Sequence, residues 1–280
     1  MTIRRARPDD ADFLVGLLTH EEVAPYLAAV RPNDRESVLA GIERSQQEPG
    51  DFGVFVIEVD GRLAGVMEVE RINRCSRIAH LGGLAVHPDF RGRRVADEAA
   101  REFQRHLLLD LGLHRLQLEV YGFNERAVHH AERVGFVREG VKRKAYRRHG
   151  EWVDGVLYGL VREDLGLSPG VDALYEYVAR HNDGVRSGDW EPLGECFADG
   201  AVLEFNGVDA GPWTGRDEIV TAYRERPPGD EVRILDAEEV GPTVVARYAW
   251  AAEPSRAAGS LAATLAGREL ARLVVSVERG

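Results

Sequence analysis

The chain has 280 residues, of which 44% are hydrophobic and 30% are charged, and its formal net charge is −11 at pH 7. This composition is typical of a soluble globular protein, and the length allows two domains that each bury a core. No apolar run approaches the roughly 18 residues that a membrane span needs, and the first ten residues lack the apolar stretch of a signal peptide. We therefore expect a cytoplasmic protein.

The acidic excess lies mainly in the second half of the chain. Residues 167–280 carry a net charge of −9 and residues 1–166 a net charge of −2. This disfavours a nucleic-acid partner, because the second half repels phosphate. Between the halves, glycine and proline in the segment 165–170 interrupt the strand pattern, and Ser168 is suited to cap a following helix. We therefore expect two domains, 1–166 and 167–280.

The two cysteines, Cys75 and Cys196, lie far apart and match neither a metal-binding spacing nor a redox pair. We expect both to be buried as small hydrophobic residues. The sequence predicts no metal site.

The first half alternates between helical and strand periodicity. In chain order it predicts a strand, two helices, three strands, a helix, a strand, a helix and two closing strands. Their expected ranges are 2–6, a helix opening at 8–10, a helix at 34–47, strands at 52–59, 62–71 and 76–86, a helix at 92–110, a strand at 115–121 and a helix at 124–134. This order indicates a mixed α/β fold with helices on a central sheet.

A short loop rich in arginine and glycine follows the strand that ends at Pro88. It leads directly into a helix with an apolar stripe that includes Ala96, Phe103 and Leu107. Such a junction presents unpaired backbone N–H groups and the positive end of a helix dipole, which together bind phosphate. The alternative is an ordinary turn with solvated arginines.

This loop resembles the pyrophosphate-binding loop of the GNAT acetyltransferases, and Ala96 to Ala99 resembles the RimJ/RimL branch of that family. The family pattern is Arg or Gln, two residues, Gly, one residue, then Gly or Ala; Arg91 and Ala96 match its ends, and Arg94 stands where the middle glycine is usual. The resemblance implies binding of acetyl-coenzyme A. The implied cofactor residues here are Leu84, Ala85, Val86, Arg91, Gly92, Arg93, Arg94, Val95 and Ala96.

A second block resembles the family signature Asn-x-x-Ala, then Gly-Phe, then Glu-Gly. Here it comprises Asn124, Ala127, Gly135, Phe136, Glu139 and Gly140. From its position, Asn124 is a good helix N-cap, and this can be its whole role. The resemblance adds that Asn124 contacts the pantetheine arm of the cofactor, beside Ala127. With the segment 152–158 similar to a closing strand of the branch, the resemblance covers residues 2–164.

The resemblance implies direct attack of a primary amine on the thioester, with both substrates held in one complex. Backbone N–H groups of the strand 84–86 would polarise the carbonyl, and Gly82 and Gly83 would let that backbone approach closely. The acceptor would be a small molecule or a peptide N-terminus.

The acid and the base are not fixed by the motifs. The two positions where the family places a catalytic hydroxyl hold Ala127 and Ala131. The residues considered for the base are Glu68, Glu70, Glu119 and His80, and those considered for the acid are Tyr121 and Tyr146. We expect His129 and His130 to be solvated, because neither lies on the apolar face of its helix.

A basic cluster occupies the late hairpin between residues 138 and 148. Our default expectation is a solvated sheet edge whose charge discourages strand pairing. The alternatives are recognition of an acidic peptide or of the 3′-phosphate of coenzyme A.

The second half predicts an α+β domain: a helix from 171, a short helix at 193–197, a strand at 201–205, a helix at 217–224, and strands at 231–239, 243–252, 259–266 and 269–278. This order suggests a curved antiparallel sheet that wraps around helices and encloses a pocket. The run resembles the SnoaL-like, or nuclear-transport-factor-2-like, cone fold. At the positions where isomerase relatives of that fold carry their catalytic residues, this chain has His181 and Phe205, which argues against that chemistry.

The sequence therefore predicts an acetyl-CoA-dependent N-acetyltransferase joined to a SnoaL-like domain that binds a ligand or forms a homodimer. One alternative is a catalytically weak GNAT protein that senses or displays coenzyme A, because Ala127, Ala131 and Arg94 depart from the family pattern. The other is a bifunctional protein with a second activity in the C-terminal pocket.

Overall fold

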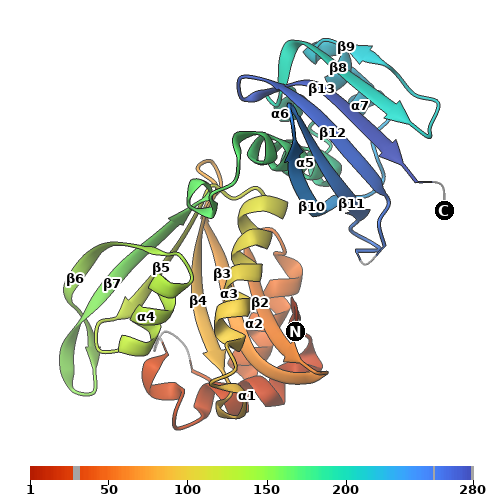
Figure 1. The fold of residues 1–280 in the computed structure, drawn as a ribbon. Helices are drawn as coiled ribbons and strands as arrows, with labels where there is room; N and C mark the ends of the chain where they lie inside the picture. The colour runs from red at the N-terminus through yellow and green to blue at the C-terminus, as the bar shows by residue number, and fades with distance from the viewer. Residues whose placement is uncertain (28–31, 255, 279–280) are drawn as a thin grey trace. The chain divides into compact units, whose positions relative to one another are not determined.

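The structure, a computed structural model, describes residues 1–27, 32–254 and 256–278. The chain divides into two compact units (Figure 1). The first contains Met1–Leu108 and Leu113–Leu165, and the second contains Leu109–Gly112 and the chain from Gly166 onward. In the described ranges, no helix is both long enough and apolar enough to cross a membrane.

The first unit is a seven-stranded sheet with helices on both faces. Its strand order is β1-β2-β3-β4-β5-β7-β6. The strands are β1 (Thr2–Arg5), β2 (Phe52–Val59), β3 (Arg62–Asn73), β4 (Ile78–Val86), β5 (Arg115–Tyr121), β6 (Val137–Arg148) and β7 (Glu151–Val161). The helices are α1 (Ala11–Thr19), α2 (Arg35–Gln47), α3 (Val95–Arg105) and α4 (Glu125–Arg133). Short 3-10 turns lie at Pro8–Asp10, Ala24–Tyr26, Pro88–Phe90 and Arg162–Leu165, and a π-helical turn, His106–Asp110, follows α3.

Alternation along β2 divides the hydrophobic core between the two faces of this sheet. Val54 and Val56 pack with Leu14 of α1 and Ile42 of α2 in one buried cluster. Phe55 points to the opposite face, where its ring lies 4.8 Å from that of Phe103 on α3. Helices α1 and α2 therefore cover one face, and α3 covers the other (Figure 1).

The sheet opens between β4 and β5. These parallel strands pair only at their beginning, from Ile78 opposite Arg115 to His80 opposite Gln117. Beyond this point no pairing joins the described parts of the two strands. On its other side, β4 carries a bulge opposite β3, and Gly83 within it has a φ of +62°. A left-handed residue at a bulge favours glycine and redirects the strand, so the backbone of 81–86 borders the gap.

The second unit is a six-stranded sheet packed on helices. Its strand order is β10-β11-β12-β13-β8-β9. The strands are β8 (Phe197–Asn206), β9 (Trp213–Thr214), β10 (Val232–Val240), β11 (Thr243–Trp250), β12 (Gly259–Ala266) and β13 (Glu269–Val277), and the helices are α5 (Pro169–Ser187), α6 (Glu191–Gly194) and α7 (Arg216–Glu225). The pairs are antiparallel except that β13 pairs with β8 in parallel, a departure from the fully antiparallel sheet expected.

Aromatic side chains fill the space between the helices and this second sheet. The hydroxyl groups of Tyr177 and Tyr223 lie 2.6 Å apart, and both side chains are buried. Trp190 stacks on Tyr223 with ring centroids 5.1 Å apart. His181, which stands at one of the catalytic positions of the isomerase relatives, is 4% exposed and pairs with the side chain of Asn182 at 3.1 Å. The residues around His181 therefore form a packed core.

The cysteines differ in their surroundings. Cys196 is buried as expected, but the prediction for Cys75 is wrong, because it is exposed in the turn between β3 and β4. Among the described residues, no three His, Cys, Asp or Glu side chains gather in a way that could hold a metal ion.

Candidate active site

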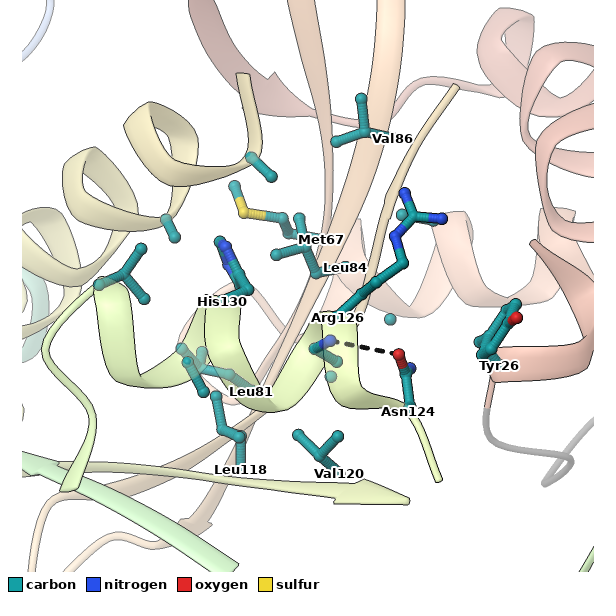
Figure 2. A pocket seen from close by; sticks show the side chains of 18 of the residues that line it. Tyr26, Met67, Leu81, Leu84, Val86, Leu118, Val120, Asn124, Arg126 and His130 are labelled. Carbon is teal, nitrogen blue, oxygen red and sulfur yellow. Dashed lines mark hydrogen bonds between the residues drawn. The ribbon is translucent and has the colours of Figure 1, made fainter. Parts of the chain in front are cut away.

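A cleft of about 1370 Å³ lies in the first unit where β4 and β5 part. Figure 2 shows an apolar floor formed by Met67, Leu81, Leu84, Leu118 and Val120. Helix α4 runs beside this floor, and residues at the start of α3 complete the lining. The cleft therefore joins an apolar channel to a helix N-terminus.

The loop before α3 has the backbone of an anion site. Gly92 has a φ of +77°, and Arg94, the N-cap residue of α3, has a φ of +59°. The left-handed conformation disfavours a side chain by about 1–2 kcal/mol, which accounts for the glycine usual at this position. Arg94 adopts that conformation nevertheless, so the loop keeps its turn and gains a positive charge in the cleft lining.

The two other arginines of this loop are held by protein groups. Arg91 forms a salt bridge with the carboxylate of Glu22 and donates from Nη2 to the Glu22 carbonyl oxygen at 3.2 Å. An anionic ligand must therefore compete with Glu22 for Arg91. The guanidinium of Arg93 lies 5.7 Å from the ring centre of Phe90, and Arg93 is not among the residues that line the cleft.

Asn124 caps α4 and also lines the cleft. Its Oδ1 accepts a hydrogen bond from the backbone N–H of Ala127 at 3.2 Å, as expected for an N-cap (Figure 2). Within the described part of the chain, its amide nitrogen has no protein partner. Because this nitrogen is a donor, it is available to a ligand in the cleft.

The structure brings five of the six candidate acid–base residues to the cleft. Glu68, His80, Glu119, Tyr121 and Tyr146 line it. Glu70 does not, because its carboxylate accepts a hydrogen bond from Nη2 of Arg44 on α2 at 2.9 Å.

Glu119 sits in a polar cluster between β5, β6 and β7. Nζ of Lys142 donates to its Oε2 at 2.7 Å. Gly155 on β7 leaves room for the carboxylate, since a Cβ there would lie 2.0 Å from Oε1. Burial, with the nearby Glu119 carboxylate, raises the pKa of Tyr146, whose ring lies 5.3 Å from that of Tyr121. Glu119 and two phenols thus share one side of the cleft.

His80 lines the cleft at the last paired position of β4, opposite Glu70 on β3. Burial lowers the pKa of His80, while the charges of Glu119 and Glu70 act in the opposite direction. A mostly neutral imidazole at the closed end of the gap can accept a proton.

The expectation for His130 is wrong. His129 is exposed as expected, but only 17% of the His130 side chain is exposed, and its Nδ1 lies 2.9 Å from Oδ1 of Asp97 on α3. Sequence periodicity places His130 beside the apolar face of α4 but cannot show that α3 covers it. The sequence feature that could have indicated this contact is the acidic residue Asp97 in the first turn of α3.

The basic hairpin is solvated only in part. Arg143, Lys144 and Arg147 are exposed, whereas Lys142 binds Glu119. Arg148 donates from Nη2 to the carbonyl oxygen of Pro25 at 2.9 Å, and its guanidinium lies 5.2 Å from the ring centre of Tyr121. The hairpin therefore supplies one wall of the cleft as well as a sheet edge.

Comparisons with known families divide the chain in the same way. The family described as "Acetyltransferase (GNAT) domain" matches residues 1–137, and the family described as "SnoaL-like domain" matches residues 178–274.

Curated relatives match the first half. The SPbeta prophage-derived uncharacterized N-acetyltransferase YokL of Bacillus subtilis is 27% identical over 61% of this chain and 94% of its own length. Spermidine N(1)-acetyltransferase of Escherichia coli K12 is 35% identical over 31% of this chain, and the match spans about half, 46%, of that relative. The putative ribosomal N-acetyltransferase YdaF of Bacillus subtilis is 25% identical over 59% of this chain and 92% of its own length.

Solved structures share the fold of the first half. A probable acetyltransferase matches with a TM-score of 0.52 and 24% identity, over 58% of this chain and 93% of its own. Ribosomal-protein-alanine N-acetyltransferase from Brucella melitensis matches with a TM-score of 0.51 and 17% identity, over 57% of this chain and 99% of its own. The first half of the chain is thus a GNAT acetyltransferase domain and the second half a SnoaL-like domain, and the protein is an acyltransferase.

Proposed function

We propose that the protein transfers an acetyl group from acetyl-CoA to a primary amine, on a small molecule or at a peptide N-terminus. The observation that carries this proposal is the shared cleft, in which the gap between β4 and β5 meets the arginine loop at the start of α3. An elongated thiol ester with a pyrophosphate at one end matches both parts of that cleft.

The cofactor would lie along the cleft from the loop to the gap. Its pyrophosphate would bind Arg91, Arg94 and the first free N–H groups of α3, with Gly92, Arg93, Val95 and Ala96 forming the rest of the loop. Its pantetheine arm would pass Asn124 and Ala127 and follow the unpaired edge of β4 at Leu84, Ala85 and Val86. A backbone N–H beside the Gly83 bulge would polarise the thioester carbonyl.

The acceptor would enter on the side where Glu68, Glu119 and Tyr121 line the cleft. A protonated amine is a poor nucleophile, so a carboxylate there would first hold the ammonium group and remove one proton. Single substitutions, followed by measurement of kcat, test which acidic residue acts as the base. Glu119→Gln should lower kcat by about 100-fold or more, the usual contribution of a general base, whereas Glu70→Gln should leave kcat close to wild type because Glu70 is turned to Arg44.

Titration calorimetry with acetyl-CoA, followed by a panel of amines with detection of free thiol, tests the proposal. Binding followed by thiol release with at least one amine is the expected result. Binding without thiol release across the panel would instead favour a coenzyme A sensor or scaffold. The specific support for that second candidate is the pair of alanines at the usual hydroxyl positions, Ala127 and Ala131.

For the second half we propose a role in homodimer formation. Among the described residues, the packed aromatic core around Tyr177 and Tyr223 leaves no ligand pocket in that part of the domain, which favours the dimer over the ligand-binding alternative there. Light scattering of the intact chain should give the mass of a dimer, while a monomer at micromolar concentration would contradict this part of the proposal.

A further inference from the structure

A buried carboxylate fixes the protonation of His130 inside the cleft. Asp97 accepts hydrogen bonds from Nε and Nη2 of Arg133, at 2.7 Å and 2.9 Å, and it contacts Nδ1 of His130 at 2.9 Å. The Arg133 guanidinium holds the pKa of Asp97 well below its usual range. An ionised carboxylate can only accept, so Nδ1 of His130 carries the hydrogen and Nε2 keeps a free lone pair.

The free nitrogen belongs to a side chain that lines the cleft. Among the described residues Nε2 of His130 has no hydrogen-bond partner, and His130 is part of the cleft lining. In Figure 2, His130 is drawn on the side of α4 that faces Met67 and Leu84. A carboxylate and an imidazole with one free nitrogen form the arrangement that general acid–base catalysis requires.

The position of His130 along α4 matches the reactive end of the cofactor. Helix α4 begins at the open mouth, after β5 ends at Tyr121, and its end leads into β6 at Val137. Val137 pairs with Gly159, which pairs with Gln117 at the closed end of the gap. His130 is six residues past Asn124, a rise of about 9 Å, so it lies deeper in the cleft than Asn124, the residue proposed above to contact the pantetheine arm.

We propose that His130 carries a proton from the attacking nitrogen to the sulfur of coenzyme A, an assignment that rests on the acyl transfer proposed above. The neutral amine forms the C–N bond and leaves the nitrogen of the adduct with one proton too many. Nε2 takes that proton, the carbonyl re-forms, the C–S bond breaks, and the imidazolium gives the proton to the sulfur. Nitrogen and sulfur are bonded to the same carbon in the adduct, so an imidazole near one is near the other.

The surroundings of His130 suit this task. Burial lowers its pKa, Asp97 on α3 raises it, and Arg133 on α4 and Arg101 on α3 lower it. The imidazole is therefore mostly neutral at pH 7 and ready to accept. The neighbouring Ala131, which also lines the cleft, stands where other family members carry a hydroxyl.

The first test compares two adjacent histidines of α4 in the intact chain. His130→Gln should lower kcat by about 100-fold or more and leave the Kd for acetyl-CoA within about twofold, whereas the exposed His129 provides the matched control His129→Gln, with kcat unchanged. Wild-type kcat should fall on the acid side below the ordinary histidine pKa of about 6.5. Asp97→Asn should move this acid-side fall in kcat to lower pH, because it removes the carboxylate that raises the pKa of His130. A His130→Gln variant that keeps the acid-side fall, or most of its kcat, would overturn the assignment.

The second test needs no turnover. Histidine imidazole ¹⁵N resonances of the full chain would be recorded with coenzyme A and with an analogue in which hydrogen replaces the thiol group. His130 Nε2 should shift differently with the two, and His129 should not. Equal His130 shifts with both ligands would overturn this assignment alone. A chain that binds neither ligand would contradict the proposed function, and this assignment with it.

Discussion

The two halves of this chain differ in whether the space beside the sheet is an open cleft or a packed core. In the first, β4 and β5 part and leave a cleft of about 1370 Å³ lined by charged and polar groups. In the second, Tyr177, Tyr223 and Trp190 fill the corresponding space: the two tyrosine hydroxyl groups pair with each other, and Trp190 stacks on Tyr223. Open backbone edges and unpartnered donors indicate a ligand site, and the cleft of the first half has both.

The largest expected effect concerns the anion site of the first half, at the loop before α3. Arg91→Ala should raise the Kd for acetyl-CoA by about 10- to 100-fold, because a charge-assisted contact contributes about 1.5–3 kcal/mol. Arg35→Ala, which breaks an exposed pair with Asp12, is the control and should leave the Kd unchanged. Titration calorimetry measures both. A folded Arg91→Ala variant with wild-type affinity would show that the loop is not part of the cofactor site.

A substitution in the packed core of the second half should lower the stability of the protein without changing cofactor binding. Tyr223→Phe leaves the buried hydroxyl of Tyr177 without its partner, and this should lower the free energy of unfolding by about 1–3 kcal/mol. Thermal or urea unfolding checks the loss. The Kd for acetyl-CoA should stay unchanged. A loss of cofactor affinity in the folded variant would show that the second half contributes to the cofactor site.

A smaller effect should follow from releasing Arg91. Glu22→Gln removes the carboxylate that holds this arginine, so acetyl-CoA should bind a few-fold more tightly, in line with about 0.2–1 kcal/mol for an exposed ion pair. The affinity gain should vanish in the Arg91→Ala background. Weaker binding in the single variant would show that Glu22 orients Arg91 for the cofactor.

The smallest effect is expected from restoring a hydroxyl in the cleft. If His130 moves the proton, Ala131→Tyr should raise kcat no more than a few-fold, measured as thiol release from a variant whose thermal unfolding matches wild type. A rise of about 100-fold, the scale of a recovered general acid, would show that proton transfer is the defect of the natural protein.

Local sequence patterns predicted most elements because strand alternation and helix caps depend on neighbours in the chain. The strands at 52–59 and 115–121 agree with the structure at both ends, and Asn124 caps its helix as expected. The parallel pairing of β8 with β13 was missed, since it joins segments about 70 residues apart and no local pattern specifies it.

The site could be predicted only where it follows the backbone of a motif. The loop 91–96 lies in or beside the cleft as the motif implied. The surroundings of single side chains depend on distant partners: Glu70 is turned aside by Arg44, 26 residues away, and His130 is covered by Asp97, 33 residues away. No periodicity along one helix or strand encodes such contacts.

The most direct test of the contrast between the halves is acetyl-CoA titration of the intact chain and of two fragments, 1–166 and 167–280. We propose these as independent domains, since no residue of the proposed cofactor site lies beyond 166. The fragment 1–166 should bind with the affinity of the intact chain, and 167–280 should not bind. A folded 1–166 fragment that fails to bind acetyl-CoA would show that the second half completes the site, and it would contradict the account.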